Sequence, residues 1–352
     1  MDFKNLIANE QALREIIPPY PAIMDKRIKS QLDSYSLEFL NMACVAVLGF
    51  SDHLLGMHYL DLKNNHFKIS SNNRLTFTLP NKQLSHIKFK SYCSLYFLIP
   101  GVGHGLRING HTLNTNGQGP LDEQKVSIYI DEVYVHCSRA SVRSSLWKQS
   151  SAQVNQNVLQ ALNSYQGKFT SLDENIQNFI EASPFIFLKT QDDKGHCELS
   201  PRGDPEKIVN VINDTTLLIA ERAGNKVAKS MRNILLNPSA CLSFLIPQVH
   251  NTLTITGEAQ LTSDDELLKP LTINKKTPKV GILISIKSIV FTNQQDGLMS
   301  SGIWNSKNYM SEKSLTAFSK VLSHHMNGTG LLGKVSTPVI NAIVRHDLKN
   351  LY

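Results

Sequence analysis

The chain has 352 residues and a formal net charge of +7, with 41% hydrophobic and 18% charged residues. These values are typical of a globular protein long enough for two domains of about 100–200 residues each. The sequence holds neither the roughly 18 uninterrupted apolar residues of a transmembrane helix nor a signal peptide at residues 1–10, so we expect a cytoplasmic protein with no membrane partner.

The first half of the chain begins with predicted helices and continues as many short strands. Residues 22–35 carry apolar side chains at near-helical spacing, and residues 37–42 predict a second short helix. Short apolar runs bounded by turn residues then predict strands at 44–48, 54–60, 66–70, 75–79, 94–99, 106–113 and 126–137, with a linking helix at 81–90. Many short strands with few helices favour a closed or nearly closed antiparallel barrel.

The same pattern restarts after a Gln-, Ser- and Asn-rich stretch at 148–167, in which 154–162 has helical character. The second half predicts helices at 172–182 and 226–236, strands at 185–188 and 197–200, a hairpin of 208–212 with 217–220, and strands at 241–246, 253–261 and 280–291. The tail predicts a helix at 315–325, a Gly-rich turn at 328–333 and a short helix at 338–347.

The restart is an internal repeat. Phe97-Leu98-Ile99-Pro100 matches Phe244-Leu245-Ile246-Pro247, and further identities follow at the same offset: Val102 with Val249, Leu106 with Leu253, Ile108 with Ile255 and Gly110 with Gly257. A repeat of this size indicates two domains and not a solenoid. We therefore predict an N-terminal barrel domain at 1–147, a linker at 148–170, a C-terminal barrel domain at 171–309 and a helical tail at 310–352.

Two polar runs in the second repeat are the strongest candidates for a binding site. Ser200-Pro201-Arg202-Gly203-Asp204 follows one predicted strand, and Arg222-Ala223-Gly224-Asn225-Lys226 leads into the predicted helix at 226–236. A turn that opens a helix presents free backbone N–H groups, and the Arg and Lys side chains add positive charge, so the two runs together favour a phosphate ester. Each run alone is also an ordinary turn composition.

These runs belong to a wider set of motifs that resembles a known family. The second repeat carries Phe179-Ile180-Glu181-Ala182-Ser183-Pro184-Phe185, the two polar runs, Met231-Arg232-Asn233-Ile234 and Asn237-Pro238. The first repeat carries Leu106-Arg107-Ile108-Asn109-Gly110, His136-Cys137-Ser138-Arg139-Ala140 and Arg143-Ser144-Ser145-Leu146-Trp147. Over roughly residues 36–305 the chain resembles two tandem copies of the pyridoxamine 5′-phosphate oxidase-like, FMN-binding split-barrel family.

The resemblance implies a mainly β fold with flanking helices, in which two split β-barrels hold FMN between them for redox chemistry on a small molecule. In the family pattern Ser200, Arg202, Arg222, Asn225 and Lys226 would hold the ribityl phosphate and the flavin edge; the same runs contribute Pro201, Gly203, Asp204 and Gly224. A true pyridoxamine phosphate oxidase is not expected, because the substrate-binding C-terminal signature of that enzyme is absent.

The two repeats keep complementary parts of the pattern. The second repeat keeps both polar runs, whereas the matching residues 57–64 of the first repeat contain no Arg-Gly-Asp. The first repeat keeps basic residues that the matching residues 292–304 of the second repeat lack, and its Arg107 corresponds in position to Thr254. We therefore predict one composite FMN site per chain, with a phosphate half from 200–233 and a closing half that includes Arg107, Arg139 and Arg143. The chain would then be an intrachain pseudo-dimer, and further homo-oligomerisation stays open.

His136 and Arg139 are the candidates for catalytic roles. A positive charge from Arg139 or Arg143 would stabilise reduced, anionic flavin, and His136, with an unperturbed pKa near 6.5, would relay a proton. A structural hydrogen bond at the end of a strand is the alternative role for His136.

Other ligand classes find less support in the sequence. The five cysteines are odd in number and have no CxxC spacing, and the adjacent His324 and His325 point to different helix faces, so we predict no disulfide framework and no metal site. The Lys and Arg residues are spread along the chain without a stacking-aromatic motif, which argues against a nucleic-acid partner.

The sequence thus favours an FMN-dependent oxidoreductase acting on a small molecule. The alternatives are a non-catalytic flavin-binding or storage protein and a split barrel that binds another ligand, such as haem or a deazaflavin. Neither the substrate nor the electron donor can be named from the residues.

Overall fold

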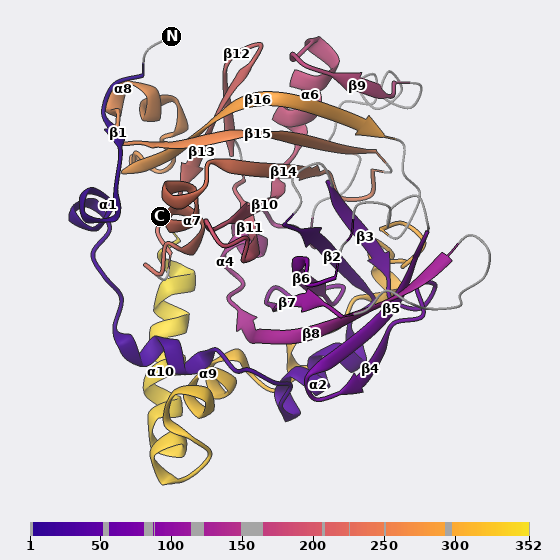
Figure 1. Ribbon diagram of the computed structural model, residues 1–352. Coiled ribbons are helices and arrows are strands. Elements are labelled where there is room, and N and C mark those ends of the chain that lie inside the picture. The colour runs from indigo at the N-terminus through magenta and orange to yellow at the C-terminus, as the bar shows by residue number, and fades with distance from the viewer. Residues whose placement is uncertain are drawn as a thin grey trace.

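The computed structural model describes residues 3–51, 56–80, 87, 89–113, 123–148, 165–205, 208–224, 226–249, 251–292 and 298–351. The fold is mainly β, with two antiparallel sheets and flanking helices, as predicted (Figure 1). The helix expected at 154–162, most of the one expected at 81–90 and most of the expected linker lie outside the described residues.

The first half of the chain forms a seven-stranded sheet. Its strands are β2 (Val45–Phe50), β3 (Met57–Asp61), β4 (Lys68–Ser71), β5 (Arg74–Pro80), β6 (Tyr92–Leu98), β7 (Gly105–Thr112) and β8 (Glu123–His136). They lie in the order β3-β2-β6-β7-β8-β5-β4. Helix α2 (Ser34–Met42) precedes the sheet and begins at Asp33, whose carboxylate accepts a hydrogen bond from the Ser36 backbone N–H at 2.9 Å.

The second half forms a nine-stranded sheet. Its main strands are β10 (Phe185–Gln191), β11 (Cys197–Gly203), β12 (Val209–Asn213), β13 (Thr216–Glu221), β14 (Ser239–Leu245), β15 (Thr252–Thr262) and β16 (Val280–Thr292). They lie in the order β11-β10-β14-β15-β16-β13-β12, with the short β1 (Leu6–Ile7) on β15 and β9 (Gly167–Phe169) on β16. Helix α6 (Glu174–Ala182) precedes this sheet, as α2 precedes the other, and α7 (Lys229–Leu236) joins β13 to β14.

The two sheets have the same strand order when β2 to β8 are matched one for one with β10 to β16. The pairing register also agrees: Phe97 lies opposite Leu106 across β6 and β7, and Phe244 lies opposite Leu253 across β14 and β15. The residues that carry the sequence repeat therefore occupy equivalent places in the two sheets.

Each sheet has a β-bulge at an equivalent glycine. The register of β7 against β8 shifts between Asn109 and Gly110, and that of β15 against β16 shifts between Thr256 and Gly257. A Cβ atom on either glycine would overlap a backbone carbonyl oxygen of the neighbouring strand. A residue without a side chain is thus required at both bulges.

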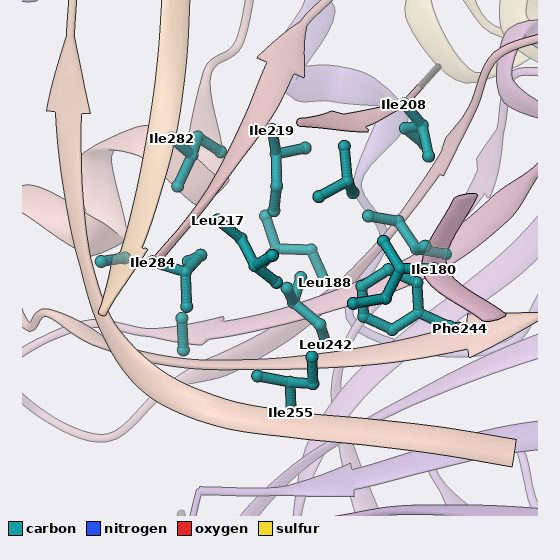
Figure 2. Packing of buried hydrophobic residues seen from close by; sticks show 14 of the residues in the cluster. Ile180, Leu188, Ile208, Leu217, Ile219, Leu242, Phe244, Ile255, Ile282 and Ile284 are labelled. Atoms are coloured by element: carbon teal, nitrogen blue, oxygen red, sulfur yellow. The ribbon is translucent and has the colours of Figure 1, made fainter. Parts of the chain in front are cut away.

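Strands β2 and β10 are buried on both faces. Ile186 and Leu188 of β10 pack into the core of their own sheet, and Figure 2 shows Leu188 in that core. Phe185 and Phe187 join a separate cluster between the two sheets. The residues of β2 divide in the same way, with alternate side chains in its own core and in the cluster between the sheets. Because side chains of a strand alternate between faces, burial of both faces explains the uninterrupted apolar runs of β2 and of residues 185–188 in β10.

The cluster between the sheets, called here the inter-sheet core, draws on β2, β3 and β6 of one half and β10, β11 and β14 of the other. Hydrogen bonds cross it as well. Tyr59 and Ser243 share one of 2.5 Å between their hydroxyl oxygens, and the Lys189 Nζ donates to the Phe50 carbonyl at 2.7 Å. The two sheets are therefore joined by both apolar packing and buried polar contacts.

Two predicted helices have the wrong bounds. The helix expected at 22–35 is a 3₁₀ helix, η1 (Ala22–Arg27), because the following residues extend and Lys29 forms a β-bridge with Val133. The helix expected at 226–236 begins at Lys229, because Lys226 and Ala228 have left-handed φ angles of 61° and 58° that a helix cannot include.

The tail contains α9 (Phe318–Asn327) and α10 (Leu331–Lys349), so the short helix predicted at 338–347 is 19 residues long and contains Pro338. Contacts with α9 stabilise the turn before the proline: Ser323 Oγ lies 2.7 Å from both the Gly333 carbonyl oxygen and Ser336 Oγ. Tertiary packing therefore outweighs the usual effect of an internal proline. Among the described residues no helix is long and apolar enough to cross a membrane.

We expect Gly110→Ala and Gly257→Ala each to lower the free energy of unfolding by more than about 1 kcal/mol, because the neighbouring strand must move to admit the methyl group. Urea unfolding followed by tryptophan fluorescence measures the change. The matched control is Gly330→Ala, where a Cβ meets nothing within 4 Å. Equal midpoints for all three variants would contradict the assignment of a bulge glycine in each sheet.

Candidate functional site

A pocket rich in charged residues, called here the polar pocket, lies where the two halves of the chain meet. The first half contributes the end of β8 and α4 (Arg139–Arg143), and the second contributes β11, the end of β13 and the start of α7. The basic residues of both repeats therefore line one pocket, as the composite-site prediction requires.

Most of the predicted site residues line this polar pocket. Those that do are Arg107, His136, Arg139, Arg143, Ser200, Pro201, Arg202, Gly203, Asp204, Arg222 and Gly224. Lys226 lies instead in an adjoining pocket that shares Arg222 and Gly224 with the first. Asn225 is outside the described residues. Their roles in binding a cofactor stay predictions.

The strand predicted at 197–200 continues to Gly203 as β11, so the run from Ser200 to Gly203 is not a turn, which was the alternative suggested by its composition. It pairs with β10, with Pro201 opposite Phe187. Since β11 is the last strand on its side of the sheet, a proline without an N–H donor is tolerated there. A Cβ on Gly203 would overlap the Ala140 carbonyl oxygen, so this glycine lets α4 pack directly against β11.

The two polar runs are held together by ion pairs. The fully buried Asp204 accepts a hydrogen bond from Arg222 Nε at 2.6 Å, and Arg202 pairs with Glu221. Asp204 therefore supports the pocket wall and is not a group that would touch a ligand directly. Arg202 and Arg222 keep their positive charge at the surface of the pocket.

Arg107 crosses from the first sheet to the second. It is 4% exposed, and its Nη1 donates to the Leu199 carbonyl at 2.5 Å and lies 3.2 Å from Glu198 Oε2. Glu198 is equally buried and also accepts a hydrogen bond of 2.7 Å from Ser230 Oγ on α7. This network connects β7, β11 and α7 at the base of the polar pocket.

The end of the C-terminal tail lies at the polar pocket, where α10 reaches α4 and α7 (Figure 1). Asp347 forms an ion pair with Arg139. The Leu351 carbonyl oxygen accepts a hydrogen bond from Arg143 Nε at 3.0 Å, and Arg143 Nη2 also donates to the Ala223 carbonyl at 2.7 Å. The tail thus contacts the basic groups that the first repeat contributes.

Positive charge exceeds negative charge around the polar pocket. Seven Arg and Lys side chains and three carboxylates line it, which leaves an excess of four positive charges. Arg27 on η1 is one of the seven, and sequence reasoning missed it because no motif surrounds it. The start of α7 also lines the pocket and adds backbone N–H groups. The arrangement is suited to an anionic ligand.

His136 lies in the pocket wall against the rings of Tyr96 and Tyr134. Desolvation there, and then the positive charges of Arg107 and Arg27, hold the pKa of His136 well below its usual range. The imidazole is therefore neutral near pH 7, which counts against a proton relay with a pKa near 6.5. Its Nδ1 lies 3.3 Å from the Cys137 carbonyl, as in the structural alternative.

The described residues include no group of three or more His, Cys, Asp or Glu side chains placed to hold a metal ion.

Arg107→Met is expected to destabilise the protein by about 3–5 kcal/mol, because it leaves the carboxylate of Glu198 buried without its counter-charge. Adding Glu198→Gln removes that charge and should recover a large part of the loss. Urea unfolding of the two single variants and the double variant measures the coupling. Additive losses in the double variant would show that Arg107 and Glu198 do not act as a pair.

A second prediction concerns pH. The unfolded chain protonates His136 near pH 6.5 but the folded protein does not, so acid favours unfolding: the wild type should lose more stability between pH 7 and pH 5 than His136→Gln. Differential scanning calorimetry at each pH measures this. His346→Gln, which removes an exposed imidazole, is the matched control. Identical pH dependence of the wild type and His136→Gln would refute the lowered pKa.

Comparison with known proteins gives a family match for one part of the chain. Residues 172–293 match the family model described as pyridoxamine 5′-phosphate oxidase. No curated protein matches the chain.

Similar solved structures have low identity and low TM-scores. HupZ of Group A Streptococcus has 15% identity over 35% of this chain and 94% of its own, with a TM-score of 0.29. A putative pyridoxamine 5′-phosphate oxidase from Lactobacillus delbrueckii has 17% identity over 35% and 97%, with a TM-score of 0.29. The MrkH–c-di-GMP complex of K. pneumonia has 10% identity over 75% and 88%, with a TM-score of 0.22. At these values the structures say nothing about function, and the family match carries the assignment: residues 172–293 form a pyridoxamine 5′-phosphate oxidase-like split-barrel domain.

Proposed function

We propose that the chain is a flavoprotein that holds one FMN in the polar pocket and acts as an oxidoreductase on a small molecule. The observation that carries the proposal is that a single pocket collects the basic residues of both halves, with an excess of four positive charges. A phosphate ester carries two negative charges near pH 7 and accepts several hydrogen bonds, so such a pocket suits it.

The residues present fit a bound phosphate. The Nε atoms of Arg107 and Arg202 are buried without a hydrogen-bond partner within the described part of the chain. Buried donors of this kind are costly to leave unpaired, and an anion in the pocket offsets that cost electrostatically. Arg202, Arg222 and the start of α7 would hold the phosphate, and Arg139 and Arg143 would close the opposite side.

Bound FMN would supply electron and hydride transfer, and the protein would supply position and charge. Arg139 and Arg143 place positive charge on the closing side of the pocket, where it would favour a reduced, anionic flavin. His136 is neutral near pH 7, so its part is to hold the strand end by its contact with the Cys137 carbonyl.

We further propose that residues 1–147 are a second split barrel, that 148–170 link it to the barrel at 171–309, and that 310–352 are an added tail. The identical strand order of the two sheets supports the duplication, and the inter-sheet core supports a pseudo-dimer within one chain.

A single flavin site per chain follows from the asymmetry of the two halves. Arg107 lies opposite Tyr96 in the first sheet, and the equivalent position opposite Ser243 in the second holds Thr254. The pseudo-symmetric site therefore lacks the cation that crosses between the sheets. We propose that only the polar pocket binds flavin.

Titration of FMN with quenching of its fluorescence tests this function. About one FMN should bind per chain, and riboflavin, which lacks the phosphate, should bind at least about tenfold more weakly. Arg202→Met removes a cation from the phosphate side and should weaken FMN binding about tenfold or more, with little effect on riboflavin. Arg143→Met removes a cation from the closing side and should weaken the binding of both FMN and riboflavin.

Lys287→Met is the control, because it removes an exposed cation that does not line the polar pocket. Failure of the wild type to bind FMN would overturn the proposal. If Arg202→Met lowers the affinity for FMN and Arg143→Met does not, the site is limited to the second half and its composite character is refuted.

A further inference from the structure

A second, largely apolar pocket lies beside the polar pocket and has a volume of about 360 Å³. Its walls come from η1, α9 and α10, with Met24, Leu322, Met326, Ile340 and Val344 among the lining side chains. This apolar pocket is in the size range of small-molecule sites, which are mostly apolar with a few placed polar groups. Nothing in the flavin function proposed above uses it.

The two pockets share part of one wall. Arg27, Cys137 and Arg139 line both of them. The apolar pocket therefore has one cationic end, and that end is the one next to the polar pocket. A molecule seated in the apolar pocket would point its polar end toward the proposed flavin.

The carboxylates of Asp25 and Glu198 act on Arg27 only from a distance. Its Nε is buried without a hydrogen-bond partner, and the structure shows no ion pair for it among the described residues. Its guanidinium carbon lies 5.3 Å from the centre of the Tyr134 ring, which is a weaker partner than a carboxylate. A cation in this state favours an anion that can reach it.

The chain places one of its own carboxylates at this position. Asp347 of α10 lines the apolar pocket and forms the ion pair with Arg139. Its side chain is 42% exposed, so the pair is open to water and can be exchanged for another anion at modest cost. The carboxylate of Asp347 marks where the head group of a ligand would lie.

We propose that the apolar pocket is a subsite for an amphipathic organic anion. The apolar body lies between η1, α9 and α10, and a carboxylate at its end takes the place of Asp347 beside Arg139 and Arg27. The anion would be the substrate of the flavin site, and in this respect the inference rests on the proposed function. Binding of the anion does not itself require FMN.

The charge at the end of the pocket selects among amphipathic molecules. A neutral ligand would leave Arg27 and Arg139 without a new partner, and a cationic ligand would be repelled by both. Selectivity between isosteric ligands arises mainly from such unpaired polar groups in the site. The acid should therefore bind much better than the alcohol or amine of the same length.

Isothermal titration calorimetry of the full chain with decanoate, decanol and decylamine tests this subsite at pH 7. Decanoate should bind at least about tenfold more tightly than decanol or decylamine, which is the size of one charge-assisted contact. Asp347→Asn removes the competing carboxylate and should tighten decanoate binding several-fold. Arg27→Met should weaken it about tenfold or more while leaving decanol unchanged.

Lys334→Met is the matched control on α10, because residue 334 is exposed and lines neither pocket. NMR of the methionine methyl groups gives a readout on the wild type: decanoate should shift the signals of Met24 and Met326, which line the pocket. Equal affinity for decanoate and decanol, or no change with Asp347→Asn, would overturn the proposal.

FMN titration of the same preparations separates the two proposals. Decanoate binding without FMN binding would keep the anionic subsite and remove the flavin function. FMN binding without any decanoate binding would keep the flavin site and refute this substrate class.

Discussion

The packing of the two sheets against each other is the constraint on which the rest of the molecule depends. It requires β2 and the first part of β10 to be apolar on two faces, so β2 and residues 185–188 are uninterrupted apolar runs. It also sets the distance between α4 and β11, which is close enough that only a glycine fits at position 203. The polar pocket lies at the rim of this contact and exists only because the halves are held together.

The asymmetry of the pocket is best explained by the covalent joining of the halves. Two identical subunits around a two-fold axis form two equal sites, and any substitution then alters both. When one chain contains both halves, Arg107 can persist in the first while its counterpart becomes Thr254 in the second. By the same reasoning the second half keeps the two polar runs that are proposed to bind the phosphate. In this proposal each half retains the part of the pattern that serves the polar pocket.

The sequence predicted those features that depend on local pattern and repetition. Apolar runs predicted the strands, and the repeated Pro and Gly positions predicted the equivalence of the two sheets. The structure adds that Gly110 and Gly257 are matched because each lies at a β-bulge. The prediction from sequence ended the strand at 197–200 too early, because the proline and glycine that follow indicate a turn except at the edge of a sheet. It also misplaced the start of α7, where Lys226 and Ala228 adopt a conformation that their residue types do not signal. Arg27 and Asp347 reach the pockets through tertiary contacts alone, so no motif could reveal them.

The C-terminal tail offsets part of the positive charge of the polar pocket. Like charges crowded in a partly desolvated site repel one another, and Asp347 together with the Leu351 carbonyl oxygen offsets part of that repulsion at Arg139 and Arg143. Under the proposed function, an anion that pairs with these arginines would compete with the contacts of the tail. The affinity of the pocket for that anion would then be the difference between two sets of interactions, and the end of α10 would contribute to it.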